Sequence, residues 1–205
     1  MRTPTVKFLI LCSLTVAGAC APIRYDVRVD AHDRGAMPPT ARVMVVAATH
    51  TDPRLGPEVE GKIERLLKDR GFQVVQPRSD SDTVDLVVLA VFGNGEPTAG
   101  AGGTAVVQLS NLLPRVPRAR AAQNRWLIVA VARPSALSGG SGVQAVPWLW
   151  YATTYADVAN GSLAQVIDYL LVPTFEWWGR TTGSRISAPI EQYDPRVRVL
   201  INPPE

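Results

Sequence analysis

The apolar positions between residues 42 and 92 predict a strand, a helix and two further strands, in that order. The first run, 42–49, is rich in Val and of strand length, which is typical of a buried strand. From residue 55 the apolar positions follow the helical period and form one stripe of Leu55, Val59, Ile63, Leu66 and Leu67. This stripe predicts a helix near 57–70, and the runs 72–76 and 84–92 predict the strands that follow it.

The second half of the chain contains three more runs with the pattern of strands. The run 147–156 is apolar on both faces, so we expect a central strand, antiparallel to a strand over 125–132. A polar, glycine-rich stretch over 135–142 predicts the loop between them. Near the C-terminus, the alternation over 196–201 predicts the last strand.

A second helix is predicted over 161–172. Ser162 and Gln165 match the capping box that begins a helix, and apolar residues recur behind them at helical spacing. Pro173 is expected to kink or end this helix. Together the elements predict a single α/β (α+β) domain over 42–205, with two main helices packed on a mixed sheet.

The first twenty residues have the pattern of an export signal. Arg2 and Lys7 give a basic start, and residues 8–19 carry no charge and are mostly apolar or small. A run of this length is too short to remain as a membrane span, so we expect a cleaved signal peptide over 1–19. One interpretation is therefore an exported soluble protein with a plain signal peptide.

The end of this stretch, Val16-Ala17-Gly18-Ala19-Cys20, resembles the lipobox of bacterial lipoproteins. The resemblance implies cleavage before Cys20, lipidation of its thiol with fatty acyl groups such as palmitate, and acylation of the new amino terminus. Because Ala21 rather than Asp follows Cys20, the resemblance also implies attachment to the outer membrane, facing the periplasm. Residues 20–41 are then the lipidated Cys20 and a tether that lets the domain stand off the membrane.

Part of this tether has the pattern of a strand. Apolar residues alternate with charged ones at Ile23, Tyr25, Val27 and Val29, which favours an early edge strand. Gly35, Pro38 and Pro39 then interrupt regular structure.

Residues 43–92 are similar to the small α/β domain that follows the lipobox in several uncharacterised families of bacterial envelope lipoproteins. The likeness consists of an Asp-Pro before the helix, a Gly-Phe after it and an Asp that opens the next strand. The stretch 150–183, in which a polar turn leads into a helix interrupted by Pro and closed by Gly-Arg-x-Thr-Gly, resembles the C-terminal part of other bacterial proteins of unknown function. These resemblances imply a fold and a location, and they imply no reaction.

Charge and cysteine content narrow the classes of function. The formal charge of +3 falls to about +1 without residues 1–19, which argues against a nucleic-acid partner. Cys12 lies in the signal peptide, so lipidation of Cys20 leaves no thiol for a disulfide, a zinc site or a nucleophile.

The glycine-rich stretch 93–103 invites comparison with a phosphate-binding loop. Such a loop needs a Lys followed by Ser or Thr after its last glycine, and Thr104 and Ala105 stand there instead. We therefore expect a connection between strands and no nucleotide or other cofactor.

Arg115, Arg118 and Arg120 form a basic cluster that we expect on an exposed loop. The cluster fits a contact with anionic headgroups or with an acidic partner. A solvated loop whose arginines pair with the acid-rich first half is the favoured interpretation.

All five Trp residues lie in the second half of the chain, where core packing is their commonest role. Trp177 and Trp178 are neighbours near the end of the predicted helix, so their side chains point in different directions. With Phe175 they form the candidate recognition surface, which would suit a glycan because aromatic faces stack on sugar rings.

The two His residues lie in unlike places and predict no metal site. His32 lies in the tether, whereas His50 and Asp52 follow a strand at the end where α/β folds place ligands. The favoured function is a lipid-anchored, non-enzymatic binding or assembly module that has the membrane, through Cys20, and an envelope protein or glycan as partners. The alternative is a periplasmic hydrolase or glycan-acting enzyme that uses His50 and Asp52.

Overall fold

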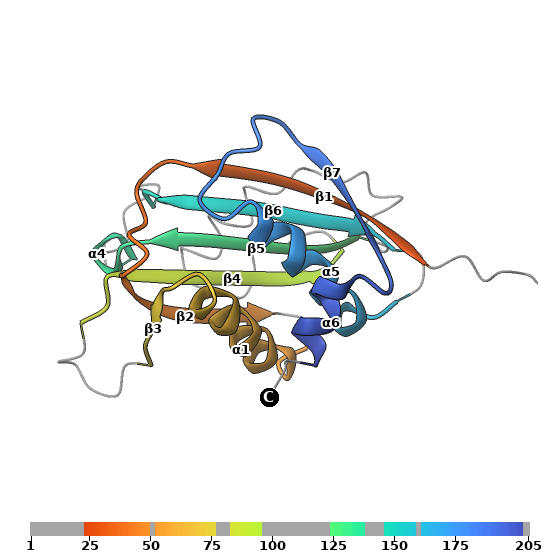
Figure 1. The fold of residues 1–205 in the computed structure, drawn as a ribbon, viewed down its shortest axis with the longest axis horizontal. Coiled ribbons are helices and arrows are strands. Elements are labelled where there is room, and N and C mark those ends of the chain that lie inside the picture. Colours follow the sequence, from red (N-terminus) through yellow and green to blue (C-terminus); the bar gives the residue numbers. More distant parts are fainter. Residues whose placement is uncertain are drawn as a thin grey trace, which may run out of the picture.

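The computed structural model describes residues 23–49, 52–76, 83–95, 124–137, 146–158 and 161–202. Within these ranges one seven-stranded sheet has the order β3-β2-β4-β5-β6-β1-β7 (Figure 1). Its strands are β1 (Arg24–Asp33), β2 (Arg42–Thr49), β3 (Gln73–Val74), β4 (Leu86–Asn94), β5 (Asn124–Ala132), β6 (Trp150–Asp157) and β7 (Ile186–Glu191). The helices are α1 (Leu55–Lys68), α4 (Pro134–Leu137), α5 (Leu163–Glu176) and α6 (Pro195–Ile201).

The sheet is mixed, as predicted. Strand β2 runs parallel to both β3 and β4, and the other neighbouring pairs are antiparallel. The parallel part arises because the chain passes from β2 through α1 to β3. The predicted antiparallel pairing of 125–132 with 147–156 is confirmed by β5 and β6, in which Val129 lies opposite Ala152. The domain therefore has the predicted α/β class, and α1 and α5 are its two main helices.

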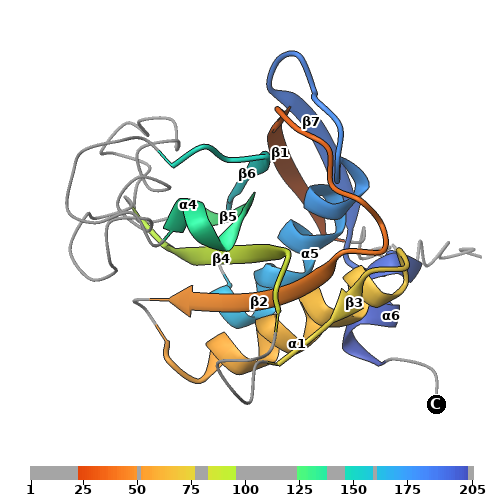
Figure 2. The same cartoon turned by 90° about the vertical axis from the view of Figure 1, so that its left-hand side faces the viewer.

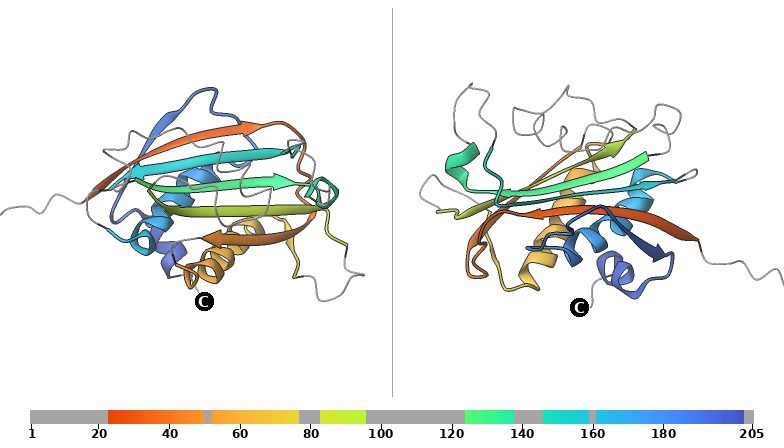
Figure 3. Two further views of the ribbon diagram at one scale, coloured as in Figure 1. Left: turned by 180° about the vertical axis from the view of Figure 1, so that it is seen from behind. Right: turned by 90° about the horizontal axis from the view of Figure 1, so that it is seen from above.

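Helices α1, α5 and α6 cover one face of the sheet (Figures 2 and 3). The strands turn alternate residues towards these helices, and Val43 and Val45 of β2 are buried there. Helix α1 contributes its predicted stripe, of which Val59 and Ile63 are fully buried. None of the helices in the described ranges has both the length and the apolar character needed to cross a bilayer.

The opposite face of the sheet carries a second apolar cluster. Trp126 and Ile128 of β5 and Tyr151 and Tyr155 of β6 are buried in it, with Trp148 beside them. Because β5 has apolar cover on both faces, its residues 126–132 form an unbroken apolar run rather than an alternation.

Helix α5 begins with the predicted capping box. The Ser162 hydroxyl accepts a hydrogen bond from the Gln165 main chain at 3.3 Å, and Gln165 Oε1 accepts one from the Ser162 main chain at 2.9 Å. Pro173 does not end this helix, which continues to Glu176.

The strand expected at the edge of the sheet lies inside it. Residues 24–33, which we placed in a tether, form β1, and this strand pairs with β6 on one side and β7 on the other. Val27, Val29 and Ala31 of β1 are fully buried. Burial of this face and pairing along both sides make β1 an integral part of the domain.

The prediction of a last strand over 196–201 was wrong, because these residues form α6. Asp194 caps this helix by accepting a hydrogen bond from the Arg196 main chain at 2.9 Å, and Pro195 occupies its first turn. The buried residues Val197 and Leu200 lie three apart, which is helical spacing. The sequence analysis also missed β7 and the short α4, which lies in the expected loop over 135–142.

Candidate binding site between α1, α5 and α6

Several residues singled out from the sequence lie outside the described ranges. These are Cys20, His50, the cluster of Arg115, Arg118 and Arg120, and the glycine-rich stretch beyond residue 95. The interpretations attached to them stay predictions.

Asp52 has a local structural role at the start of α1. Its Oδ1 accepts a hydrogen bond from the Arg54 main chain at 3.1 Å, and its main-chain oxygen accepts one from Leu55 at 3.0 Å. These two bonds form the polar turn that leads from β2 into α1.

The candidate recognition surface is largely part of the core. Phe175 is only 2% exposed, so it cannot lie on a surface, and its ring stacks parallel to Trp178 with 5.2 Å between centroids. The ring of Trp178 also packs against that of Trp150, with 4.8 Å between centroids. Trp177 is half-buried, and the Arg180 guanidinium lies 4.9 Å from its ring centre. The aromatic group therefore anchors the end of α5 to the sheet.

A cavity of about 910 Å³ lies on the helical side of the sheet. Its volume is in the range of small-molecule sites in proteins. The helices supply one part of its lining, namely Pro57, Glu58, Gly61, Lys62, Arg65, Ala164, Gln165, Asp168, Tyr169, Leu200 and Ile201. The remainder comes from Ile23, Tyr25, Gly161 and Gln192.

Buried charges join α1 to α5 beside this cavity. Lys62 Nζ donates hydrogen bonds to Glu58 Oε1 at 2.6 Å and to Asp168 Oδ2 at 3.0 Å. Asp168 Oδ1 lies 2.7 Å from the same ammonium group, but at an angle that makes no hydrogen bond, and no other donor of the described residues bonds to it. Lys62 and Asp168 are both buried, whereas Glu58 is exposed.

Burial controls the ionisation of two groups in this lining. Burial raises the pKa of Asp168 above its ordinary value, and the hydrogen bond and positive charge of Lys62 oppose that rise. Burial also raises the pKa of Tyr169. The Tyr169 hydroxyl donates to the Gln192 main-chain oxygen at 2.8 Å, and its ring lies 4.3 Å from that of Tyr25. The cavity therefore offers an ammonium group, two carboxyl groups and an aromatic wall to a ligand.

A second hollow of about 510 Å³ lies between the same three helices. Arg65 and Leu200 line both hollows, and Arg65 donates to the Leu200 main-chain oxygen at 3.0 Å. This hydrogen bond holds α6 in place between the two hollows. The interior of the smaller hollow is apolar, with Val172 and Phe175 among its lining residues.

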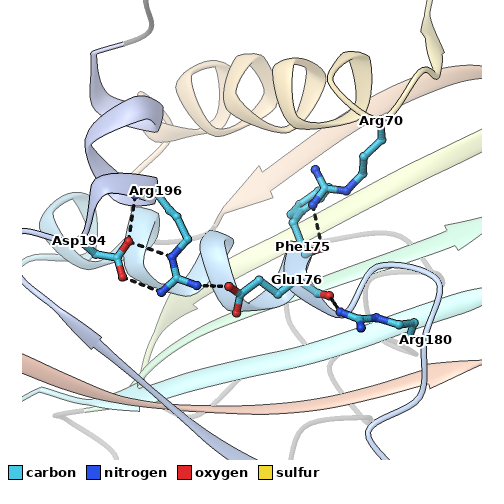
Figure 4. A network of polar contacts seen from close by, with 6 residues as sticks. All are labelled: Arg70, Phe175, Glu176, Arg180, Asp194 and Arg196. Atoms are coloured by element: carbon cyan, nitrogen blue, oxygen red, sulfur yellow. Dashed lines mark hydrogen bonds and ion pairs between the residues drawn. The ribbon is translucent and has the colours of Figure 1, made fainter.

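Charged side chains fix the helix ends around the smaller hollow (Figure 4). Arg196 lies between two carboxylates and forms ion pairs with Asp194, at 2.6 Å, and with Glu176.

Arg70 donates to the main-chain oxygens of Leu66, at 2.8 Å, and Phe175, at 2.9 Å. Its charge therefore lies where both α1 and α5 end, which the helix dipoles favour. Burial lowers the pKa of Arg70.

On the other face of the sheet, β1 carries a pair that the sequence analysis had placed in the tether. His32 Nε2 lies 3.0 Å from Asp30 Oδ1, and the imidazole stacks on Tyr151 at 4.7 Å. Since Val29 and Ala31 turn towards the helices, this pair lies opposite the cavity. In the described part of the chain no three potential metal ligands gather in one place.

The Lys62–Asp168 pair was missed because both residues lie within apolar patterns. Lys62 is three residues after Val59 and seven after Leu55, which places it on the buried stripe of α1. Asp168 interrupts the apolar run of α5. A charge on the buried side of each of two helices was the available signal that the two would pair.

No protein-family model matches the chain, and neither does any curated protein. Among solved structures, it is similar to a PelC dodecamer from Paraburkholderia phytofirmans, with 12% identity over 72% of this chain and 93% of that chain, and a TM-score of 0.42. It is also similar to a PDZ domain protein from Parabacteroides distasonis, with 11% identity over 82% of this chain and 39% of that chain, and a TM-score of 0.42. These likenesses are too weak to indicate a function.

Proposed function

We propose that this protein is a lipid-anchored binding module of the bacterial cell envelope, and that it holds a polar ligand in the larger cavity. The anchor is an acylated Cys20, and the location is the outer membrane, facing the periplasm. The lipobox-like sequence that ends at Cys20 supports the anchor, and the cavity supports the binding role.

The observation that carries the binding role is the pairing of Lys62 with Asp168 in the wall of a cavity of about 910 Å³. An anionic group of a ligand can take the place of the exposed Glu58 carboxylate at the Lys62 ammonium. Asp168, which lines the same cavity, holds this ammonium group in place. Tyr25 adds an aromatic ring to the wall. These features favour an envelope glycan fragment that carries a carboxyl group.

The enzyme alternative stays a prediction, because His50 lies outside the described residues. Asp52, its expected partner, is engaged in the turn that starts α1.

The anchor is tested by the intact mass of the protein extracted from bacterial membranes. We expect a chain that begins at Cys20 and carries fatty acyl groups, and a Cys20→Ser variant that is not acylated. A wild-type chain cleaved at the same place without acyl groups would support the plain signal peptide instead.

The binding role is tested by crosslinking in cells, with mass spectrometry of the products and Cys20→Ser as the control. Crosslinks from Lys62 or its neighbours to glycan fragments support the proposal. A defined protein partner that disappears in the control would instead indicate a membrane-tethered assembly role.

A further inference from the structure

Exposed apolar side chains gather at one end of the domain. In the described ranges the exposed large apolar residues are Ile23 (55%), Val46 (38%), Tyr193 (60%), Val199 (52%) and Ile201 (51%). All but Val46 lie at the start of β1, after β7 or on α6. We call Ile23, Tyr193 and Ile201 the apolar rim, and we leave out Val199 because it lines the smaller hollow on the other side of α6.

Contacts between these segments make the apolar rim one surface. The Ile23 main-chain oxygen accepts a hydrogen bond of 2.8 Å from Gln192, the neighbour of Tyr193. Ile23 and Ile201 both line the larger cavity and are exposed, so they lie at its mouth. Figure 1 shows the start of β1 and α6 at the same end of the sheet. Tyr193 contacts α6 as well, because the Arg198 guanidinium lies over its ring.

Basic residues accompany this apolar surface. Arg24 follows Ile23 and is exposed, and the Arg198 guanidinium lies 5.6 Å from the ring centre of Tyr193. Arginine and tyrosine next to exposed aliphatic side chains are suited to the boundary between anionic headgroups and acyl chains.

The length of chain between the anchor and the domain decides what this surface faces. Cys20 precedes Ile23 by three residues, and three residues span at most about 11 Å in any conformation. Since β1 begins at Arg24, an acylated Cys20 holds this end of the domain against the headgroups. The long tether expected from the sequence is not available, because β1 uses residues 24–33.

We infer that the apolar rim seats directly on the membrane surface, so that the mouth of the larger cavity lies beside the bilayer. This inference rests on the proposed lipid anchor at Cys20. The partner that the apolar rim contacts is thus an anionic phospholipid surface.

The test uses the chain from Cys20 to Glu205, in which Cys20 supplies the single thiol. This thiol is coupled to a maleimide lipid in vesicles of phosphatidylethanolamine and phosphatidylglycerol, and amide hydrogen exchange is then measured. We expect exchange in α6 to slow about tenfold relative to the uncoupled chain, because seating restricts its opening. A variant with Ile23→Ser, Tyr193→Ser and Ile201→Ser is expected to lose this protection.

Val46→Ser is the matched control, because Val46 is exposed on β2 while its neighbour Val45 packs towards the helices. This variant should keep the protection of α6. Equal exchange in the coupled and uncoupled wild-type chains, or full protection in the triple variant, would overturn the inference. Because chemical coupling replaces acylation in the cell, the result does not depend on whether Cys20 is acylated there.

Discussion

Lys62 of α1 and Asp168 of α5 form a buried ion pair, with 2.7 Å between Nζ and Oδ1. The two residues are 106 positions apart in the chain, so the pair joins helices from distant parts of the sequence. Burial of two charges brings a large desolvation cost, which is offset only while both partners are present. The stability of the domain therefore depends on the same lysine that we propose to contact a ligand.

Replacing either partner alone is expected to destabilise the domain. Lys62→Met or Asp168→Leu leaves one buried group without its partner, and we expect a loss of about 3–5 kcal/mol in the free energy of unfolding. The double variant Lys62→Met/Asp168→Leu should recover most of that loss, because it removes both charges. Urea denaturation of all four proteins measures the coupling. Additive single effects would show that the two side chains do not depend on each other.

The raised pKa of Asp168 predicts a dependence of stability on pH. Between its ordinary pKa of 3.8 and its higher folded value, the folded state binds this proton more tightly than the unfolded chain does. The contribution of Asp168 is therefore fully present below pH 3.8 and is lost as the pH rises through the folded pKa. We expect Asp168→Asn to remove this contribution from the pH profile of unfolding. An NMR titration in which the Asp168 carboxyl has an ordinary or lowered pKa would contradict the prediction.

Arg70 is expected to stabilise the ends of two helices at once. In Arg70→Met the main-chain oxygens of Leu66 and Phe175 lose their donor, which we expect to cost about 1–3 kcal/mol. Arg70→Lys should recover only part of this, since an ammonium group lacks the planar fork that reaches both oxygens. Lys68→Met, at an exposed position on α1, is the control in the same denaturation experiment and should change stability by less than about 0.5 kcal/mol.

Phe175 is expected to contribute to the stability of the domain and not to contact a ligand. Its buried ring packs on Trp178, so Phe175→Ala should cost about 3–5 kcal/mol. Thermal and urea unfolding measure the loss. A Phe175→Ala protein of unchanged stability but weakened ligand binding would contradict this prediction and would indicate that the ring contacts a ligand.

The strands with long apolar runs were predictable from the sequence, whereas β7, which depends on pairing, was not. Residues 86–92 of β4 and 126–132 of β5 are unbroken apolar runs, and the positions of these strands follow from that alone. β7 has only one buried residue, Ile190, and takes its conformation from pairing with β1. The helix α6 was mistaken for a strand because the alternation of Arg and Val concealed the Asp194–Pro195 start signal.

The candidate site was less predictable than the fold. Tyr25 and Tyr169 meet because β1 enters the interior of the sheet beneath α5, and no local pattern gives that topology. The sequence did mark Ser162 and Gln165, which start α5 at the edge of the cavity. Local signals therefore placed the helices, whereas the cavity between them depends on contacts over long distances in the chain.

Gly61 offers a way to close the larger cavity without disturbing the core. It lines the cavity from the middle of α1, and apart from its chain neighbours and the backbone of its own helix, a Cβ at this position meets no atom of the described residues within 4 Å. Gly61→Ala should raise the free energy of unfolding by about 0.8–1 kcal/mol, since alanine favours a helix interior. Gly61→Tyr adds a ring that fills part of the cavity. The two variants thus separate helix stability from access to the cavity.

The most direct measurement is the binding of muropeptides from digested peptidoglycan to two forms of the Cys20→Ser chain, one with Gly61→Ala and one with Gly61→Tyr. Native mass spectrometry measures the bound fraction. We expect bound muropeptide with the Gly61→Ala chain and a loss of about tenfold or more in affinity with Gly61→Tyr, equivalent to about 1.4 kcal/mol. Equal binding to the two variants, or no binding to the Gly61→Ala chain, would contradict a glycan-binding role for this cavity.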